Sequence, residues 1–143
     1  MGREISELFE VDVEAFMGNL QAMKSYVDDI INKTQTRRFV IYDLLGNLGS
    51  LANKACILET IIFLIKRKAQ KFRPNNTDLH QVLTDLERDI RSMRSDILVI
   101  MQTYQKDPNF AINNAYNDLL DISARTNMIR LKMNTFIQEG LFA

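Results

Sequence analysis

The stretch ACILETIIFLIKRKAQKFRPNNT, residues 55–77, decides which fold the chain can adopt. Its first half is almost entirely apolar, its second half carries five Lys or Arg residues, and it ends in a run of turn-forming residues that begins at Pro74. Three kinds of segment have such a sequence: a membrane span with a basic flank, a basic segment that binds nucleic acid, and the buried helix of a helical bundle.

The membrane interpretation fails on length and on charge. The uninterrupted apolar run, Ile61–Ile65, has five residues, whereas a membrane-spanning helix needs roughly twenty. Extending this run toward the N-terminus meets Glu59 and Lys54, and each of these charges costs about 2.5–3.5 kcal/mol at the centre of a bilayer. We therefore expect no membrane span in this segment.

Apolar residues recur in alternating steps of three and four along nearly the whole chain. In and around the quoted stretch they are Ile41, Leu44, Leu48, Leu51, Ala55, Leu58, Ile62, Ile65, Ala69 and Phe72. Similar runs extend over residues 9–30, over residues 79–104 and from Ile112 to residue 136. A period near 3.5 residues is typical of long helices that pack at shallow angles, and 5 Gly and 2 Pro in 143 residues are few for a β fold. The sequence therefore predicts an all-α protein.

Turn-forming residues mark two of the helix boundaries. Residues 73–77 stop one helix and offer Asn76 or Thr77 as the N-cap of the next. Asp107 and Pro108 mark the other boundary, with Asp107 as the N-cap and Pro108 in the favoured first helical position. Because short linkers make their flanking helices antiparallel neighbours, we predict an up-down-up-down four-helix bundle.

The first boundary, at Asn32–Thr36, is weaker because it contains neither Gly nor Pro. The apolar phase even continues through it by way of Thr34 and Arg37. If no turn forms there, residues 9–72 make one helix of roughly 95 Å, at 1.5 Å per residue, and the alternative fold is a three-helix chain in an intertwined dimer. Thr34 and Arg37 are poor seam residues, which favours the turn and the compact bundle.

A second apolar stripe, Ile57, Ile61 and Leu64, lies beside the main one. At roughly 100° per residue it is displaced around the helix by about one residue's turn. In a four-helix bundle each helix normally buries one stripe, so this stripe is a candidate protein-binding surface, with a homodimer as the simplest form. The alternative is that the first and the fourth helix both flank this one and cover both stripes.

Five cations follow the apolar run: Lys66, Arg67, Lys68, Lys71 and Arg73. The whole chain has a net charge of zero, which argues against a general affinity for nucleic acid or anionic lipid. Residues 36–74, however, hold eight Lys or Arg against two Asp or Glu, whereas residues 1–35 carry a net −4 and residues 75–107 a net −2. Pairing between neighbouring helices explains this division. The alternative is a basic patch for nucleic acid or phosphate, although neither a Gly-rich phosphate loop nor an aromatic set beyond Phe72 accompanies it.

His80 is the single histidine, and Cys56 is the single cysteine. This set is too small for the usual zinc or di-iron sites, and no nucleophile motif such as G-x-S-x-G occurs, so we expect no metal, no cofactor and no enzymatic activity. Phosphotransfer through His80 is a further alternative, because the string Leu79–Thr84 vaguely resembles a phospho-accepting dimerisation helix, without its usual acidic neighbour.

Taken together, the sequence predicts a single helical-bundle domain over residues 1–143. A lone cysteine and the absence of a recognisable leader favour a cytoplasmic chain. The predicted function is that of a non-enzymatic interaction module, such as an adaptor, a scaffold or a complex subunit. Its predicted partner is another protein or a second copy of itself.

Overall fold

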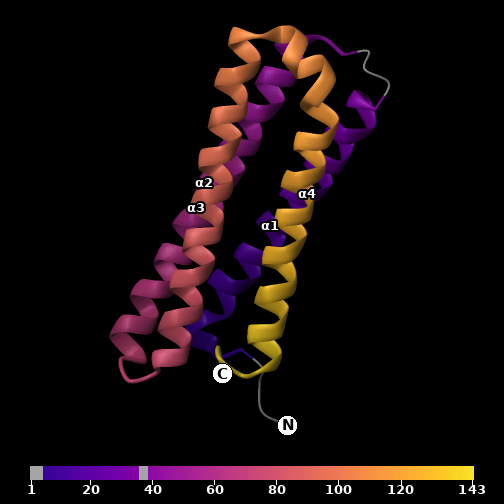
Figure 1. Ribbon diagram of the computed structural model, residues 1–143. Helices are drawn as coiled ribbons and strands as arrows, with labels where there is room; N and C mark the ends of the chain where they lie inside the picture. Colours follow the sequence, from indigo (N-terminus) through magenta and orange to yellow (C-terminus); the bar gives the residue numbers. More distant parts are fainter. Residues whose placement is uncertain (1–4, 36–38) are drawn as a thin grey trace.

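The computed structural model describes residues 5–35 and 39–143, and in them four long α-helices lie side by side (Figure 1). The helices are α1 (Glu7–Thr34), α2 (Ile41–Phe72), α3 (Thr77–Lys106) and α4 (Pro108–Gln138). Helices α1 and α3 each pack against both α2 and α4, so α2 and α4 occupy opposite corners of the bundle. The prediction of an all-α, up-down-up-down four-helix bundle is confirmed.

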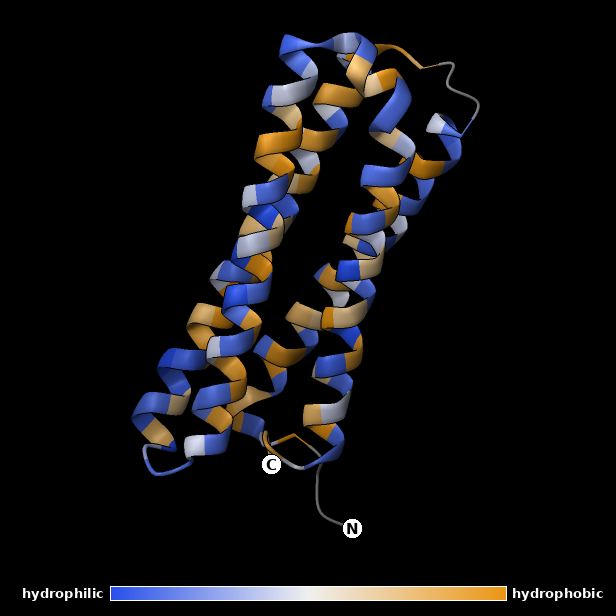
Figure 2. Ribbon diagram, in the orientation of Figure 1, coloured by the Kyte–Doolittle hydropathy of each residue, from blue (hydrophilic) through white to orange (hydrophobic). Residues whose placement is uncertain are grey.

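One apolar stripe from each helix forms the common core. On α2 the seam residues Leu58, Ile62 and Ile65 are fully buried, as the three-and-four spacing predicts. Figure 2 shows hydrophobic and hydrophilic residues interspersed along each helix. Burying a Leu or Ile side chain contributes about 1.5–3 kcal/mol, so these four stripes supply the main stabilisation of the fold.

The alternative of one continuous helix through residues 9–72 is wrong. Helix α1 ends at Thr34 and α2 begins at Ile41, and the two helices pack against each other. The turn begins later than the expected Asn32–Thr36, since α1 continues through Thr34, and Thr36 and Arg37 lie outside the described residues. Thr34 is buried in the seam, where its hydroxyl donates to the carbonyl of Ile31 at 3.0 Å and so leaves no polar group unsatisfied.

The other two boundaries form as predicted. Asn76 caps α3, with its side-chain oxygen accepting from the backbone N–H of Leu79 at 3.1 Å. Asp107 caps α4 in the same way, and Pro108 occupies the first helical position.

Two residues assigned to the seam from their spacing are exposed. Phe72 is the last residue of α2, and Ile112 lies one position after Ala111, which is buried in its place. The prediction was wrong at these two helix ends because the spacing rule does not specify where the covering helices stop or which of two adjacent apolar residues faces inward.

The C-terminal residues close one end of the bundle, a feature that the heptad pattern did not indicate. Gly140 has a φ of +76°, and the N–H of Leu141 bonds to the carbonyl of Phe136 at 3.1 Å, the arrangement of a Schellman turn. The turn directs Phe142 into the core, where its ring lies edge-on to Phe9 with the centroids 5.8 Å apart. The carbonyl of Phe142 also accepts from the N–H of Ser6 at 2.6 Å, which ties the two ends of the chain together.

We expect Phe142→Ala to lower the free energy of unfolding by about 3 kcal/mol, because the substitution removes a fully buried ring. Urea denaturation followed by circular dichroism measures this effect. Tyr42→Ala is the control, since Tyr42 is 82% exposed and its loss should cost less than about 0.5 kcal/mol. Equal stability of the two variants would contradict a structural role for the C-terminal turn.

Candidate protein interaction surface

Polar contacts fix the side of α2 that faces α1. The ammonium group of Lys68 pairs with the carboxylate of Asp12 at 2.7 Å, and that of Lys54 lies 5.1 Å from the ring centroid of Tyr26. Both partners belong to α1, so Lys54 and Lys68 mark one edge of α2.

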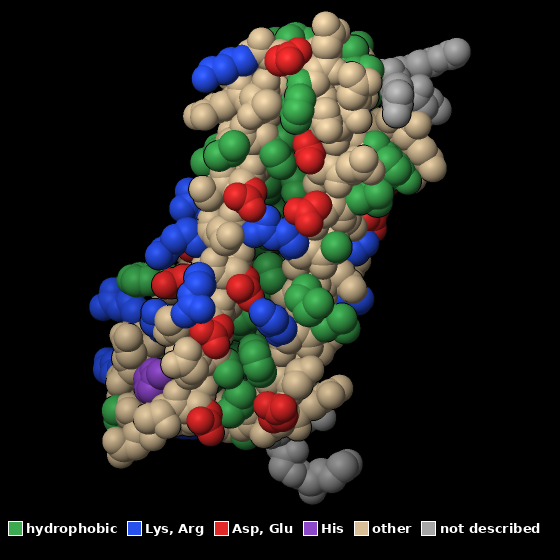
Figure 3. All heavy atoms as spheres, in the orientation of Figure 1, with side chains coloured by type: hydrophobic (Ala, Val, Ile, Leu, Met, Phe, Trp, Pro, Cys, Tyr) green, Lys and Arg blue, Asp and Glu red, His purple; other side chains and the backbone are tan. Residues whose placement is uncertain are grey.

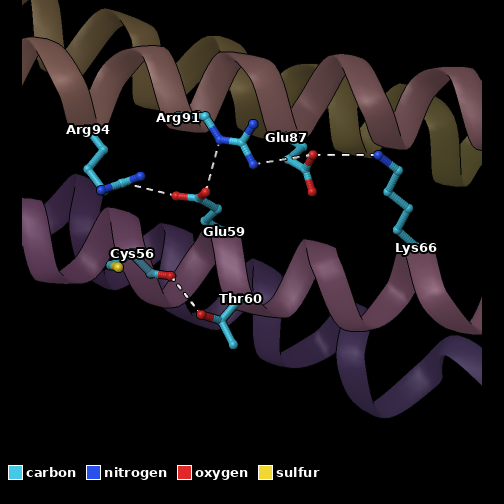
Figure 4. Close-up of polar contacts among 7 residues, drawn as sticks. All are labelled: Cys56, Glu59, Thr60, Lys66, Glu87, Arg91 and Arg94. Atoms are coloured by element: carbon cyan, nitrogen blue, oxygen red, sulfur yellow. Dashed lines mark hydrogen bonds and ion pairs between the residues drawn. The ribbon is translucent and has the colours of Figure 1, made fainter.

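A network of ion pairs fixes the opposite edge of α2 against α3 (Figure 4). The carboxylate of Glu59 accepts from Arg91 Nε at 3.1 Å and from Arg94 Nε at 2.9 Å. Lys66 reaches Glu87 at 3.5 Å, and Arg91 also lies 3.6 Å from Glu87. Because the side chain of Glu59 is only 18% exposed, its pairing with two guanidinium groups matters more than an ordinary surface ion pair.

Between these two edges α2 presents an apolar surface to the outside. We call it the outward face of α2 and define it by Cys56, Ile57, Thr60, Phe63 and Leu64, all of which are exposed. Ile57 is 47%, Phe63 49% and Leu64 46% exposed. The hydroxyl of Thr60 donates to the backbone carbonyl of Cys56 at 3.0 Å (Figure 4). Its hydrogen-bond donor is therefore satisfied within the helix, without a partner from solvent.

The outward face of α2 is also free of charge. From Tyr42 to Arg73 the exposed charged positions are Asp43, Arg67 and Lys71, and none of them lies between residues 44 and 66. Helix α3 differs, since Arg88, Arg91 and Asp96 are all exposed along its middle. An uncharged apolar surface over several turns of one helix is typical of a protein contact.

The structure divides the predicted stripe of Ile57, Ile61 and Leu64. Ile57 and Leu64 belong to the outward face, whereas Ile61 is less exposed than either and packs against the core. Helices α1 and α3 flank α2, so the expectation that the first and fourth helices do so was wrong, and these two neighbours cover one of the three residues and leave two. Phe63, which the stripe did not include, joins Ile57 and Leu64 at the surface.

The structure also divides the predicted basic patch. Lys66 and Lys68 pair with Glu87 of α3 and Asp12 of α1, as expected for complementary neighbouring helices. Within the described part of the chain, no carboxylate lies within 4 Å of Arg67, Lys71 or Arg73. Figure 3 shows Lys and Arg side chains gathered along the edge formed by α2 and α3.

Sequence reasoning missed a second apolar surface, which lies on α4 at the opposite corner of the bundle. Its exposed residues Leu120, Ala124, Met128 and Leu131 follow one another at steps of four, four and three, and hydrophobic side chains are visible along α4 in Figure 3. The same spacing is present in the sequence.

Three charged residues of α4 contact α3 beside this surface, whereas Asp121 is exposed and lies 4.0 Å from Arg125 of the same helix. Arg125 pairs with Asp96, Lys132 with Asp89 at 2.7 Å, and the buried hydroxyl of Tyr104 donates to Asp118. Burial and this bond to Asp118 raise the pKa of Tyr104 far above its ordinary range.

On the other flank of α4, Ser123 donates to Asp28 of α1 at 2.8 Å. Burial alone would raise the pKa of Asp28, but hydrogen bonds from Lys24 and Ser123 outweigh it and lower this pKa below its ordinary value. Since the folded pKa is depressed, the stabilisation from this contact is present above the unfolded pKa and is lost as pH falls through the folded one.

His80 makes a structural contact at the end of α2. Its Nε2 lies 2.9 Å from the backbone carbonyl of Arg73, which ties the first turn of α3 to the residue that follows α2. The contact explains a lone histidine at this position, and it engages one of the two ring nitrogens that phosphotransfer would use.

Within residues 5–35 and 39–143, no group of three or more His, Cys, Asp or Glu is placed to hold a metal ion. In the same part of the chain α2 is the one helix long and apolar enough to cross a membrane, and 39% of its most apolar window is buried inside the bundle. The core helix of a bundle has the same length and composition, so the expectation that α2 spans no membrane stays a prediction.

Comparison with protein-family models, with curated proteins and with solved structures gives no match. The outward face of α2 and the cations that follow it are therefore the features of this structure that bear on function.

We expect Glu59→Gln to lower the free energy of unfolding by about 1–3 kcal/mol, because it leaves Arg91 and Arg94 without their shared carboxylate. Asp85→Asn is the matched control, since Asp85 pairs with the exposed Arg88 within one helix and should contribute less than about 0.5 kcal/mol. Urea unfolding of both variants measures the difference. Equal losses would show that Glu59 does not fix the α2–α3 contact.

Proposed function

We propose that this chain is a non-enzymatic interaction module, an adaptor or complex subunit that binds a helix of another protein, or of a second copy, on the outward face of α2. The observation that carries the proposal is the group formed by Ile57, Phe63 and Leu64, three large apolar side chains about half exposed on a surface without charge. The two flanks of α2 are fixed to α1 and α3, so this face is turned away from the core.

The physical gain from covering this face is substantial. Full burial of a Leu, Ile or Phe side chain contributes about 1.5–3 kcal/mol, and half of that surface is still in contact with water. Covering the three side chains therefore adds roughly 3 kcal/mol to an association, which is more than a hundredfold in affinity.

A helix is the partner element that best fits this surface. Ile57 and Leu64 lie seven residues, or about two turns, apart on one helix, with Thr60 and Phe63 between them, and such a surface accepts the side chains of a second helix that packs at a shallow angle. Recognition of an amphipathic helix through such anchors is a recurring mode of protein binding.

We expect the double variant Ile57→Glu, Leu64→Glu to remain folded and to lose association, because both residues are half exposed and each glutamate places a charge in the contact. Two measurements test this: the molar mass in solution by sedimentation equilibrium, and titration with a neutral synthetic helix of about five turns that carries one leucine stripe. The loss in affinity should be at least about tenfold.

The matched control is Leu120→Glu, Leu131→Glu, which introduces the same charges on the exposed apolar surface of α4. The proposal expects the control to associate and to bind the peptide as the unmodified chain does. A wild-type chain that stays monomeric and also fails to bind the peptide would contradict the proposal. A control variant that loses binding while the α2 variant keeps it would place the contact on α4 instead.

A further inference from the structure

Three cations near the end of α2 have a different environment from their neighbours. The charge of Lys66 is neutralised by Glu87 of α3, and that of Lys68 by Asp12 of α1. No carboxylate in the described residues lies within 4 Å of Arg67, Lys71 or Arg73. The positive charges of these three side chains are therefore not neutralised by a carboxylate of the described residues.

Aromatic rings hold these cations at the surface. The guanidinium of Arg67 lies 5.8 Å from the ring centroid of Phe63, and the ammonium of Lys71 lies 5.2 Å from that of Phe72. The guanidinium of Arg73 lies 6.0 Å from the ring centroid of Phe9 of α1, and Arg73 donates to the backbone carbonyl of Phe72 at 3.1 Å. Contacts of this kind contribute about 0.5–1 kcal/mol each at exposed sites, and they reduce the conformational freedom that a partner would otherwise have to remove.

The cations continue the outward face of α2. Arg67 follows Leu64 by three residues and Lys71 follows it by seven, and both are exposed. A shallow hollow of about 490 Å³ lies between them, lined by Arg67, Lys68, Gln70, Lys71 and Phe72. The surface is thus apolar and uncharged from Cys56 to Leu64 and cationic beyond Leu64. Its two ends along the helix therefore differ in charge.

Pairing with the α2 surface of a second copy does not supply carboxylates to this cationic end. Antiparallel pairing of two α2 helices about Thr60 would place Arg67 opposite Asn53 and Lys71 opposite Gly49 of the other copy. Parallel pairing would place the cations opposite themselves, which is repulsive. In both of these α2–α2 pairings Arg67 and Lys71 gain no carboxylate, so the pairing covers the apolar half of the surface and leaves the cationic half without a partner.

We infer that the outward face of α2 binds an amphipathic helix of another protein whose apolar stripe covers Ile57, Phe63 and Leu64 and whose acidic end lies over Arg67 and Lys71. The inference rests on the proposed function and adds the chemical class of the partner. Carboxylates above Arg67 are favoured because a guanidinium binds a carboxylate with two parallel hydrogen bonds.

Three synthetic helical peptides test the inference by fluorescence anisotropy. They share one leucine stripe and differ in their polar residues: one has glutamates in its last two turns, one has them in its first two turns, and one has glutamine in their place. We expect one of the two acidic peptides to bind about tenfold more tightly than the glutamine peptide at low salt, with the advantage reduced at high salt.

The variant Arg67→Gln, Lys71→Gln should lower the affinity for the preferred acidic peptide by about tenfold and leave that for the glutamine peptide unchanged. Arg88→Gln, which removes an exposed cation of α3, is the matched control and should change neither affinity.

The outcomes separate the inference from the proposed function. If the glutamine peptide binds as tightly as both acidic ones, and Ile57→Glu, Leu64→Glu abolishes all binding, the surface is a helix-binding site and the acidic partner is wrong. If no peptide binds, both fail. If a duplex DNA or RNA oligonucleotide binds through Arg67 and Lys71 more tightly than any peptide, with a steep salt dependence, the partner is nucleic acid and the inference is overturned.

Discussion

The structure depends on the burial of one apolar stripe from each helix in a common core. Four helices in a ring give each member two neighbours, and that arrangement hides the seam of α2 completely: Leu58, Ile62 and Ile65 have no exposed surface. Helix α2 is nevertheless apolar over a wider arc than this seam. Since its neighbours can cover only part of that arc, Ile57, Phe63 and Leu64 remain at the surface, and a surface of this kind gains free energy when another helix covers it.

The rotation of α2 about its own axis is set by charge as well as by the core. Glu59 and Lys66 engage α3, while Lys54 and Lys68 engage α1. These contacts explain why a basic helix lies between two acidic ones in a chain with no net charge. They also explain why Arg67 and Lys71 differ from Lys66 and Lys68: both follow the outward face and are exposed, and no carboxylate in the described residues lies within 4 Å of either.

Much of the fold follows from spacing and turn chemistry, whereas the surface does not. The seam of α2 and the caps at Asn76 and Asp107 could be predicted, because periodicity and capping are local properties of the sequence. The burial of Ile61 beside the exposure of Leu64 could not, because the width of the arc that α1 and α3 cover depends on their side chains. The Schellman turn at Gly140 had a sequence signal in the glycine itself, yet the contact of Phe142 with Phe9 joins residues far apart in the chain.

The central claim is that the outward face of α2, and not the apolar surface of α4, receives a partner helix. Methyl NMR of the intact protein with isotope-labelled isoleucine and leucine tests it most directly, because Ile57 and Leu64 report on α2 while Leu120 and Leu131 report on α4. On addition of the preferred acidic helical peptide, the account predicts shifts at Ile57 and Leu64 with Leu120 and Leu131 unchanged. Shifts confined to the α4 methyl groups, or none at saturating peptide, would contradict it.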